Sequence, residues 1–265
     1  MRRQVPHSPR RHRSPGRFFL GLLLLFASLP STQAQAADIV PSRSVTANGM
    51  TVLFLEQHFL PTVEIHALVK VGSAQDPPDK AGLANLTASL LDEGTQTRTS
   101  RQIAEQIDFV GGSLEAHAAE DFTTASARVL KKDADLGFAL LADVLQHPAF
   151  HKQEFERVRT QILGEILSDD DDPGNVAMKA FHQLIFHGHP YSWPAHGAED
   201  TLNKITVADV QQFHAREYLP NQTILVIVGD LTQEQAATLV QTHFGSWKKG
   251  APSPYQLKKP TPIDR

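Results

Sequence analysis

The sequence of 265 residues contains no cysteine. A disulfide framework, a zinc site made of thiolates and a thiol nucleophile are therefore excluded. The chain also lacks an apolar run of the roughly 20 residues that an ordinary membrane-spanning helix needs. The run from Phe18 to Leu29 is shorter, and it follows a leader with several arginines and no acidic residue before Asp38.

The basic leader and the short apolar run are typical of an export signal. Ala34-Gln35-Ala36 fits a small-x-small cleavage site, so we expect residues 1–36 to be a signal peptide that is removed before Ala37. The alternative is an uncleaved anchor, in which case this segment would be the chain's contact with a membrane. The lack of cysteine is compatible with the bacterial periplasm, which is the predicted location.

Removing residues 1–36 takes away 6 of the 25 basic residues and none of the 29 acidic ones, which leaves a net charge of −10. This charge argues against nucleic acid as a partner. Residues 37–250 are long enough for one domain with its own core. The Pro- and Lys-rich stretch at 251–265 has no apolar periodicity and is predicted to be a linker toward a second domain that is absent here.

The sequence pattern predicts an α+β fold. Asn48-Gly49 is a strong hairpin signal between two apolar segments. In the segment from Thr62 to Val71, apolar residues alternate with polar ones, as in a strand with one buried face. Strands are predicted at 44–47, 50–56, 62–71, 113–118, 122–130 and 223–228, and helices at about 100–109, 133–146, 152–168, 174–186, 206–216 and 232–243. We therefore expect a two-layer sandwich of a mostly antiparallel six-stranded sheet with helices packed on it.

One helical segment, Gly82 to Thr95, reads Gly-Leu-Ala-Asn-Leu-Thr-Ala-Ser-Leu-Leu-Asp-Glu-Gly-Thr. It resembles the inverted zinc-protease helix, H-x-x-E-H, of the pitrilysin/insulinase metallopeptidases. On that frame Asn85 replaces the first His, Ala88 the catalytic Glu and Ser89 the second His. Glu165, about 76 residues beyond Ser89, takes the position of the family's third zinc ligand.

Other segments carry the same resemblance, which extends from about 45 to 247, nearly the whole mature chain. They are His187-Gly188-His189-Pro190-Tyr191, Gly197, Tyr218-Leu219-Pro220-Asn221 and Val228-Gly229-Asp230. The resemblance implies a fold like that of the processing peptidases, in which two such domains make a half-shell and two half-shells close around a peptide. It also implies that a motif-bearing chain can work with a partner that has lost the motif.

The replaced residues cannot perform zinc chemistry. Two His at i and i+4 lie on one face of a helix and can bind one zinc ion, while the Glu beside them takes a proton from the bound water. Asn85 offers only an amide, Ser89 a neutral hydroxyl and Ala88 nothing. We therefore expect no catalytic residue and no bound metal or other cofactor in this chain, and zinc only in a catalytic partner.

Several other polar groups are predicted to have ordinary surface roles. The histidines at 182, 187, 189 and 196 are expected in surface loops, although a metal site is the alternative. The acidic run at 169–172 is expected to be a solvated loop at the end of a helix, and Asp92 and Glu93 are expected to face solvent.

Two glycines open a predicted strand that, by the resemblance, lies beside the peptide cleft. An extended peptide can add to such an edge as a further strand. The candidate peptide-binding residues are Gly111, Gly112, Ser113, Leu114, Glu115 and Ala116. The alternative is an ordinary glycine turn.

Three functional hypotheses follow from the sequence. The first is a non-catalytic, peptidase-like subunit that is exported, binds peptide and pairs with a motif-bearing homologue or with itself. The second is an active zinc endopeptidase with unconventional ligands. The third is a binding or scaffold protein that uses the fold without any protease.

Overall fold

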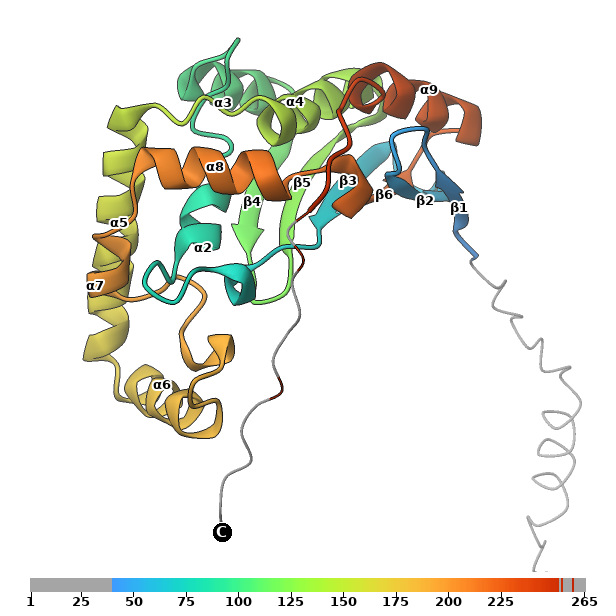
Figure 1. Cartoon of the computed structure of the whole chain (residues 1–265). Helices are drawn as coiled ribbons and strands as arrows, with labels where there is room; N and C mark the ends of the chain where they lie inside the picture. The colour runs from blue at the N-terminus through green and yellow to red at the C-terminus, as the bar shows by residue number, and fades with distance from the viewer. Residues whose placement is uncertain (1–39, 253, 255–258, 260–265) are drawn as a thin grey trace, which may run out of the picture. The chain divides into compact units, whose positions relative to one another are not determined.

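The computed structural model of the protein describes residues 40–252, 254 and 259 (Figure 1). The predicted signal peptide at 1–36 and most of the predicted linker at 251–265 lie outside the described residues.

Six strands form one sheet in the order β1-β2-β6-β3-β5-β4. Their bounds are β1 Ser42–Val45, β2 Thr51–Glu56, β3 Thr62–Val69, β4 Ser113–Ala118, β5 Thr123–Leu130 and β6 Thr223–Gly229. Only the pairing of β2 with β6 is parallel among the strands described here. The prediction of a mostly antiparallel six-stranded sheet is therefore confirmed.

The predicted hairpin at Asn48-Gly49 joins β1 to β2. Gly49 has a φ of +89°, a conformation that glycine adopts without steric cost. Its amide donates to the carbonyl of Thr46 at 2.9 Å, and the Thr46 amide donates to the carbonyl of Met50 at 2.9 Å. The turn chemistry of the sequence thus fixes the register of this edge of the sheet.

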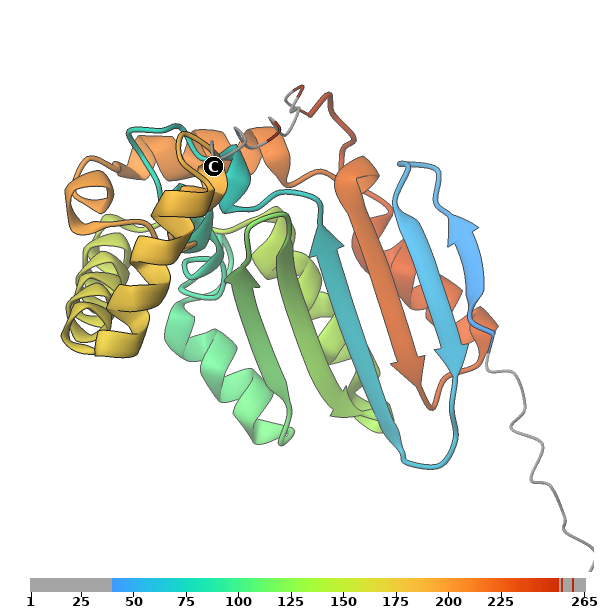
Figure 2. The same ribbon diagram turned by 90° about the horizontal axis from the view of Figure 1, so that it is seen from below.

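One face of the sheet is buried beneath helices and the other is not. On β3, Val63, Ile65 and Ala67 are fully buried, whereas His66 is exposed and Glu64 is half-buried. Figure 2 looks onto the face across which no described helix lies. This arrangement is the predicted two-layer sandwich.

The eight α-helices of the described chain supply the second layer. Their bounds are α2 Leu83–Ala88, α3 Ser100–Phe109, α4 Ala134–Gln146, α5 Lys152–Asp171, α6 Pro173–Ile185, α7 Glu199–Leu202, α8 Val207–Glu217 and α9 Gln233–Phe244. Phe138, Phe155, Phe213 and Phe244, each on a helix, are the largest fully buried side chains of the described core. No helix in this part of the chain combines the length and the apolar character that crossing a bilayer requires.

Candidate functional site

The segment that leads into α2 is held by hydrogen bonds and by close backbone contact. The Asp76 carboxylate accepts from the amides of Gly82 at 2.8 Å and Ala84 at 2.9 Å. Gly82 and Gly197 both have positive φ, of +99° and +80°. A Cβ atom on Gly197 would lie 2.2 Å from the carbonyl oxygen of Ala81, so only glycine permits this approach.

The replaced motif residues lie on α2 at helical spacing. The Ser89 amide donates to the carbonyl of Asn85 at 2.9 Å, so the two positions are one helical turn apart. Ser89 is the last half-helical residue, because α2 ends at Ala88. Asn85 and Ser89 are half-buried, and Ala88 is fully buried against the core.

Glu165 belongs to α5, which packs against α2. Its side chain is exposed, and it accepts a hydrogen bond from Gln161 Nε2 at 3.2 Å, one turn earlier on the same helix. The buried face of α5 consists instead of Phe155, Val158, Ile162 and Ile166. Glu165 is thus engaged as a surface residue of α5.

This set of side chains does not fit a zinc ion. A catalytic zinc site needs three nitrogen, sulfur or carboxylate ligands, and only Glu165 among the four motif positions offers one. Elsewhere in the described chain, no three His, Asp or Glu side chains lie close enough together to hold a metal ion. The general base is also missing, because Ala88 has no proton acceptor in its side chain.

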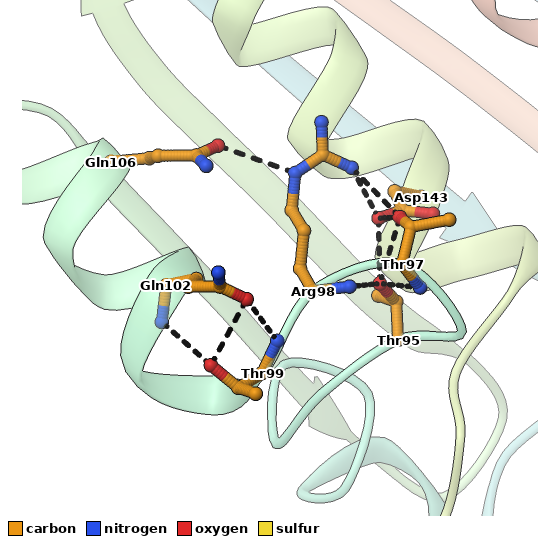
Figure 3. A network of polar contacts seen from close by, with 7 residues as sticks. All are labelled: Thr95, Thr97, Arg98, Thr99, Gln102, Gln106 and Asp143. Carbon is orange, nitrogen blue, oxygen red and sulfur yellow. Dashed lines mark hydrogen bonds and ion pairs between the residues drawn. The ribbon is translucent and has the colours of Figure 1, made fainter.

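A polar network fastens the chain after α2 to α4 (Figure 3). The buried Asp143 carboxylate accepts from Thr95 Oγ1 at 2.7 Å, from Thr97 Oγ1 at 3.2 Å and from the Arg98 guanidinium at 2.5 Å. Thr99 then caps α3, and Gln102 Oε1 accepts from the Thr99 amide at 2.9 Å. The strap from Thr95 to Thr99 is therefore fixed at both ends.

The prediction that Asp92 and Glu93 face solvent is wrong. Both are half-buried in a pocket between α3 and the start of β4. Glu93 pairs with Arg157 at 2.5 Å and accepts from Ser100 Oγ at 3.0 Å. Burial raises the pKa of Asp92 to about 6, and the nearby Glu93 charge adds to the rise. The cause is α3, which folds over both residues.

The candidate peptide-binding segment lies at an edge of the sheet. β4 is the last strand of the order and, among the described strands, pairs with β5 alone. Helix α3 lies beside it in Figure 2. Gly111 has a φ of +64°, and a Cβ atom on Gly112 would lie 2.7 Å from the carbonyl oxygen of Arg128. The glycines are thus needed for the turn itself, and peptide binding by residues 111–116 stays a prediction.

The four predicted surface histidines differ in their surroundings. His187 is exposed, as predicted, and His196 is half-buried in the loop before α7. His182 is half-buried on α6, so for this residue the loop prediction is wrong. His189 is buried, with 4% of its surface exposed, between the rings of Phe186 and Tyr191. For His189 the prediction is wrong, because aromatic neighbours from the same loop cover it.

The acidic run at 169–172 was predicted to be a solvated loop at a helix end. Helix α5 continues to Asp171, and Asp172 then caps α6, because its carboxylate accepts from the Asn175 amide at 2.9 Å. Asp169 and Asp170 are also engaged, by Asn175 Nδ2 at 3.0 Å and by Lys179 at 2.9 Å. The prediction of a loop is therefore wrong, because three of the four residues are helical and the run joins α5 to α6.

Sequence comparison identifies the family of this fold. Residues 51–199 match the sequence model of the insulinase family, peptidase family M16, and residues 204–265 match the model of the peptidase M16 inactive domain. The chain belongs to the insulinase family, peptidase family M16. The resemblance noted in the sequence is thereby confirmed.

Among curated relatives, an uncharacterized zinc protease of Mycobacterium tuberculosis is 33% identical over 214 residues, which cover 80% of this chain and 48% of that protein. Subunit 1 of the mitochondrial cytochrome b-c1 complex of Bos taurus is 27% identical over 216 residues, which cover 81% of this chain and 45% of that subunit. The chain thus spans about half the length of the curated relatives it matches.

Solved structures agree with the family assignment. The peptidase M16 inactive domain from Pseudomonas fluorescens is similar with a TM-score of 0.78 and 27% identity, over 83% of this chain and 54% of that chain. Pitrilysin has the same fold, with a TM-score of 0.77 and 22% identity over 85% of this chain and 25% of that chain.

Sequence reasoning missed two residues near the motif of this insulinase-family chain. Asp76 binds the first amides of α2, and burial raises its pKa to about 8 although those amides oppose the rise. Thr201 Oγ1 donates to the carbonyl of Ala81 at 2.9 Å and so holds the same approach. The run Asp76-Pro77-Pro78 before the glycine was a usable signal for the first.

Proposed function

We propose that this chain is a non-catalytic, peptidase-like subunit of an exported zinc-protease assembly, in which it helps to bind peptide or to build the substrate chamber. The observation that carries the proposal is the motif helix itself. Asn85, Ala88 and Ser89 sit on α2 where the family frame has two zinc ligands and the general base. The helix is kept while its chemistry is lost.

Two comparisons support a subunit role. A relative that matches 81% of this chain is named as a subunit of the mitochondrial cytochrome b-c1 complex, so related sequences occur in a multisubunit assembly. A structural neighbour with 27% identity is described as an M16 inactive domain. The first relative is named for an assembly and not for proteolysis, and the second is named as an inactive domain.

The metal content of purified protein tests the non-catalytic part. We expect substoichiometric zinc and no peptide cleavage from the wild-type chain. The matched variant carries Asn85→His, Ala88→Glu and Ser89→His, and we expect it to gain zinc because Glu165 is still available as a further ligand. About one zinc per wild-type chain, lost on Glu165→Ala, would instead favour the active peptidase with unconventional ligands.

The partner is tested by light scattering. Co-expression with a homologue that carries H-x-x-E-H should yield a heterodimer and raise the thermal stability of this chain, since a ligand of the folded state shifts unfolding by mass action. A chain that stays monomeric at tens of micromolar, alone and with the homologue, would favour the stand-alone scaffold.

Peptide binding at the sheet edge is tested by hydrogen exchange. An added strand would protect the amides of β4 when unstructured peptides are present, because the backbone groups on the open side of an edge strand gain partners. β1 is the opposite edge of the same sheet and serves as the internal control. Equal protection of both edges, or of neither, would count against binding at residues 111–116.

A further inference from the structure

A small pocket lies beside the approach to α2 and is separate from the replaced motif residues. Its volume is about 240 Å³. One wall comes from the segment between β3 and α2, and includes Asp76, Pro77 and Pro78. The other comes from the loop between α6 and α7, and includes His189 and Trp193. Because the ring of proline fixes φ, the proline-rich walls hold the pocket in shape without a ligand.

His189 lines this pocket and has an unused hydrogen-bond donor. Its Nδ1 accepts from the Tyr191 amide at 3.2 Å, so in the neutral ring the hydrogen is on Nε2. That Nε2 atom is buried and has no hydrogen-bond partner in the described structure. Buried polar groups in proteins are nearly always paired, so the unpaired donor indicates that an acceptor is supplied from outside the chain.

The other lining residues define the chemistry of that acceptor. Trp193 and the prolines at 77, 78, 190 and 194 provide apolar surface. No lysine or arginine is among the residues that line the pocket in the described structure, so a carboxylate would lose its hydration there without gaining a cation. A neutral carbonyl attached to an apolar group therefore fits the pocket better than an anion does.

The pocket has the size of a single residue and lies next to the end of β4, the candidate peptide-binding strand. Sites for drug-sized ligands span roughly 300–1,000 Å³, so this one suits a single side chain with its peptide group. The pocket residue Ser73 donates its amide to the carbonyl of Ala119 at 3.0 Å, and the Ala74 amide donates to the carbonyl of Glu120 at 2.8 Å. These two carbonyls belong to the turn that follows β4.

We propose that this pocket binds one apolar residue of an uncharged, extended peptide segment, whose backbone carbonyl accepts the hydrogen of His189 Nε2 while its side chain packs on Trp193. This inference deepens the proposed peptide binding and rests on it. It adds an anchoring site beyond the end of β4, within the loop that contains His189 and Trp193.

The chain has a built-in reporter for this site. It contains two tryptophans, Trp193 in the pocket and Trp247, which is buried against Phe244. Their indole N–H signals in a ¹H–¹⁵N NMR spectrum therefore separate binding in the pocket from a general change in the protein. The probe is N-acetylphenylalaninamide, which has an apolar ring and neutral carbonyls.

We expect saturable movement of the Trp193 signal with a Kd on the order of millimolar, the strength that a fragment of this size reaches. The Trp247 signal should stay fixed. His189→Phe keeps an aromatic ring and removes the donor, so the probe should bind about tenfold more weakly. His187→Phe, at the exposed histidine two residues earlier, is the matched control and should bind as the wild type does.

Two further measurements keep the proposal falsifiable if His189→Phe does not fold. In wild-type protein with ¹⁵N-labelled histidine, the probe should shift the His189 Nε2 signal as that atom gains an acceptor. N-acetylphenylalanine, which carries a carboxylate, should bind at least tenfold more weakly than the amide. An unmoved Trp193 signal, an unmoved Nε2 signal or equal binding of acid and amide would each overturn the proposal.

The test also separates this inference from the proposed function. Peptide that protects β4 without moving the Trp193 signal would overturn the pocket and leave edge binding in place. Probe binding in the pocket, with no peptide protection at β4, would support the pocket and count against the edge.

Discussion

Replacing His214 should make the protein less sensitive to acid. His214 lies on α8, and its Nε2 donates to the carbonyl of Leu145 at 2.9 Å. Its ring stacks on the ring of Tyr218, with 4.7 Å between the ring centroids. Burial lowers its pKa from 6.5 to about 4. The neutral imidazole is thus the form that the folded state accommodates.

The sign and size of the effect follow from this pKa difference. Between pH 6.5 and 4 the unfolded chain binds the proton and the folded chain does not, so stability is lost as the pH falls through this range. One pKa unit corresponds to 1.36 kcal/mol. The gap from 6.5 to about 4 therefore corresponds to at most about 3 kcal/mol, and above pH 6.5 His214 contributes no pH dependence.

Urea unfolding followed by circular dichroism between pH 4 and 8 measures this contribution. His214→Gln can keep a donor near Leu145 but does not titrate. The stability difference between wild type and variant should be constant above pH 6.5 and should narrow by about 3 kcal/mol at pH 4. His187→Gln controls for the loss of a histidine from an exposed position. Parallel curves for wild type and His214→Gln over the whole range would refute the reasoning.

Three further outcomes are expected. Asp143→Ala should cost about 1–3 kcal/mol in urea unfolding, because Thr95, Thr97 and the partly exposed Arg98 lose their shared acceptor, and a loss below about 0.5 kcal/mol would contradict the role given to this network. Gly197→Ala should destabilise the protein by more than Gly188→Ala, since both have positive φ but only the first places a Cβ atom against backbone, and equal melting temperatures would refute this. Export should remove residues 1–36, so mass spectrometry should find Ala37 at the mature N-terminus; a chain that retains Met1 and pellets with membranes would indicate an anchor.

The sequence predicts the individual elements well because their signals are local. The alternation on β3 and the turn at Asn48-Gly49 each depend on neighbouring residues, and each is found as predicted. Among the helices, α7 was not predicted; it has only four residues, too few for periodicity to show. The α+β class then follows from the number and order of the elements.

Features that depend on how loops and distant segments pack could not be read in the same way. The burial of Asp92 and His189 comes from α3 and from the aromatic residues of one loop, and neither leaves a periodic trace in the sequence. The contact between Gly82 and the carbonyl of His196, where a Cβ atom would lie 2.6 Å away, joins residues more than 100 positions apart. The replaced motif could be recognised only by comparison with the H-x-x-E-H helix of the family.

The insertion of β6 between β2 and β3 determines when this sheet can form during synthesis. β2 and β3 follow each other in sequence but do not pair with each other. Leu53 of β2 pairs with Val226 of β6, and Ile65 of β3 pairs with Ile227 of β6, about 160 residues later in the chain. Until the ribosome has released Gly229, the strands on either side of the gap have no central partner. Among the described strands β6 is the last in sequence, so the centre of the sheet can form only after nearly the whole domain has been synthesised.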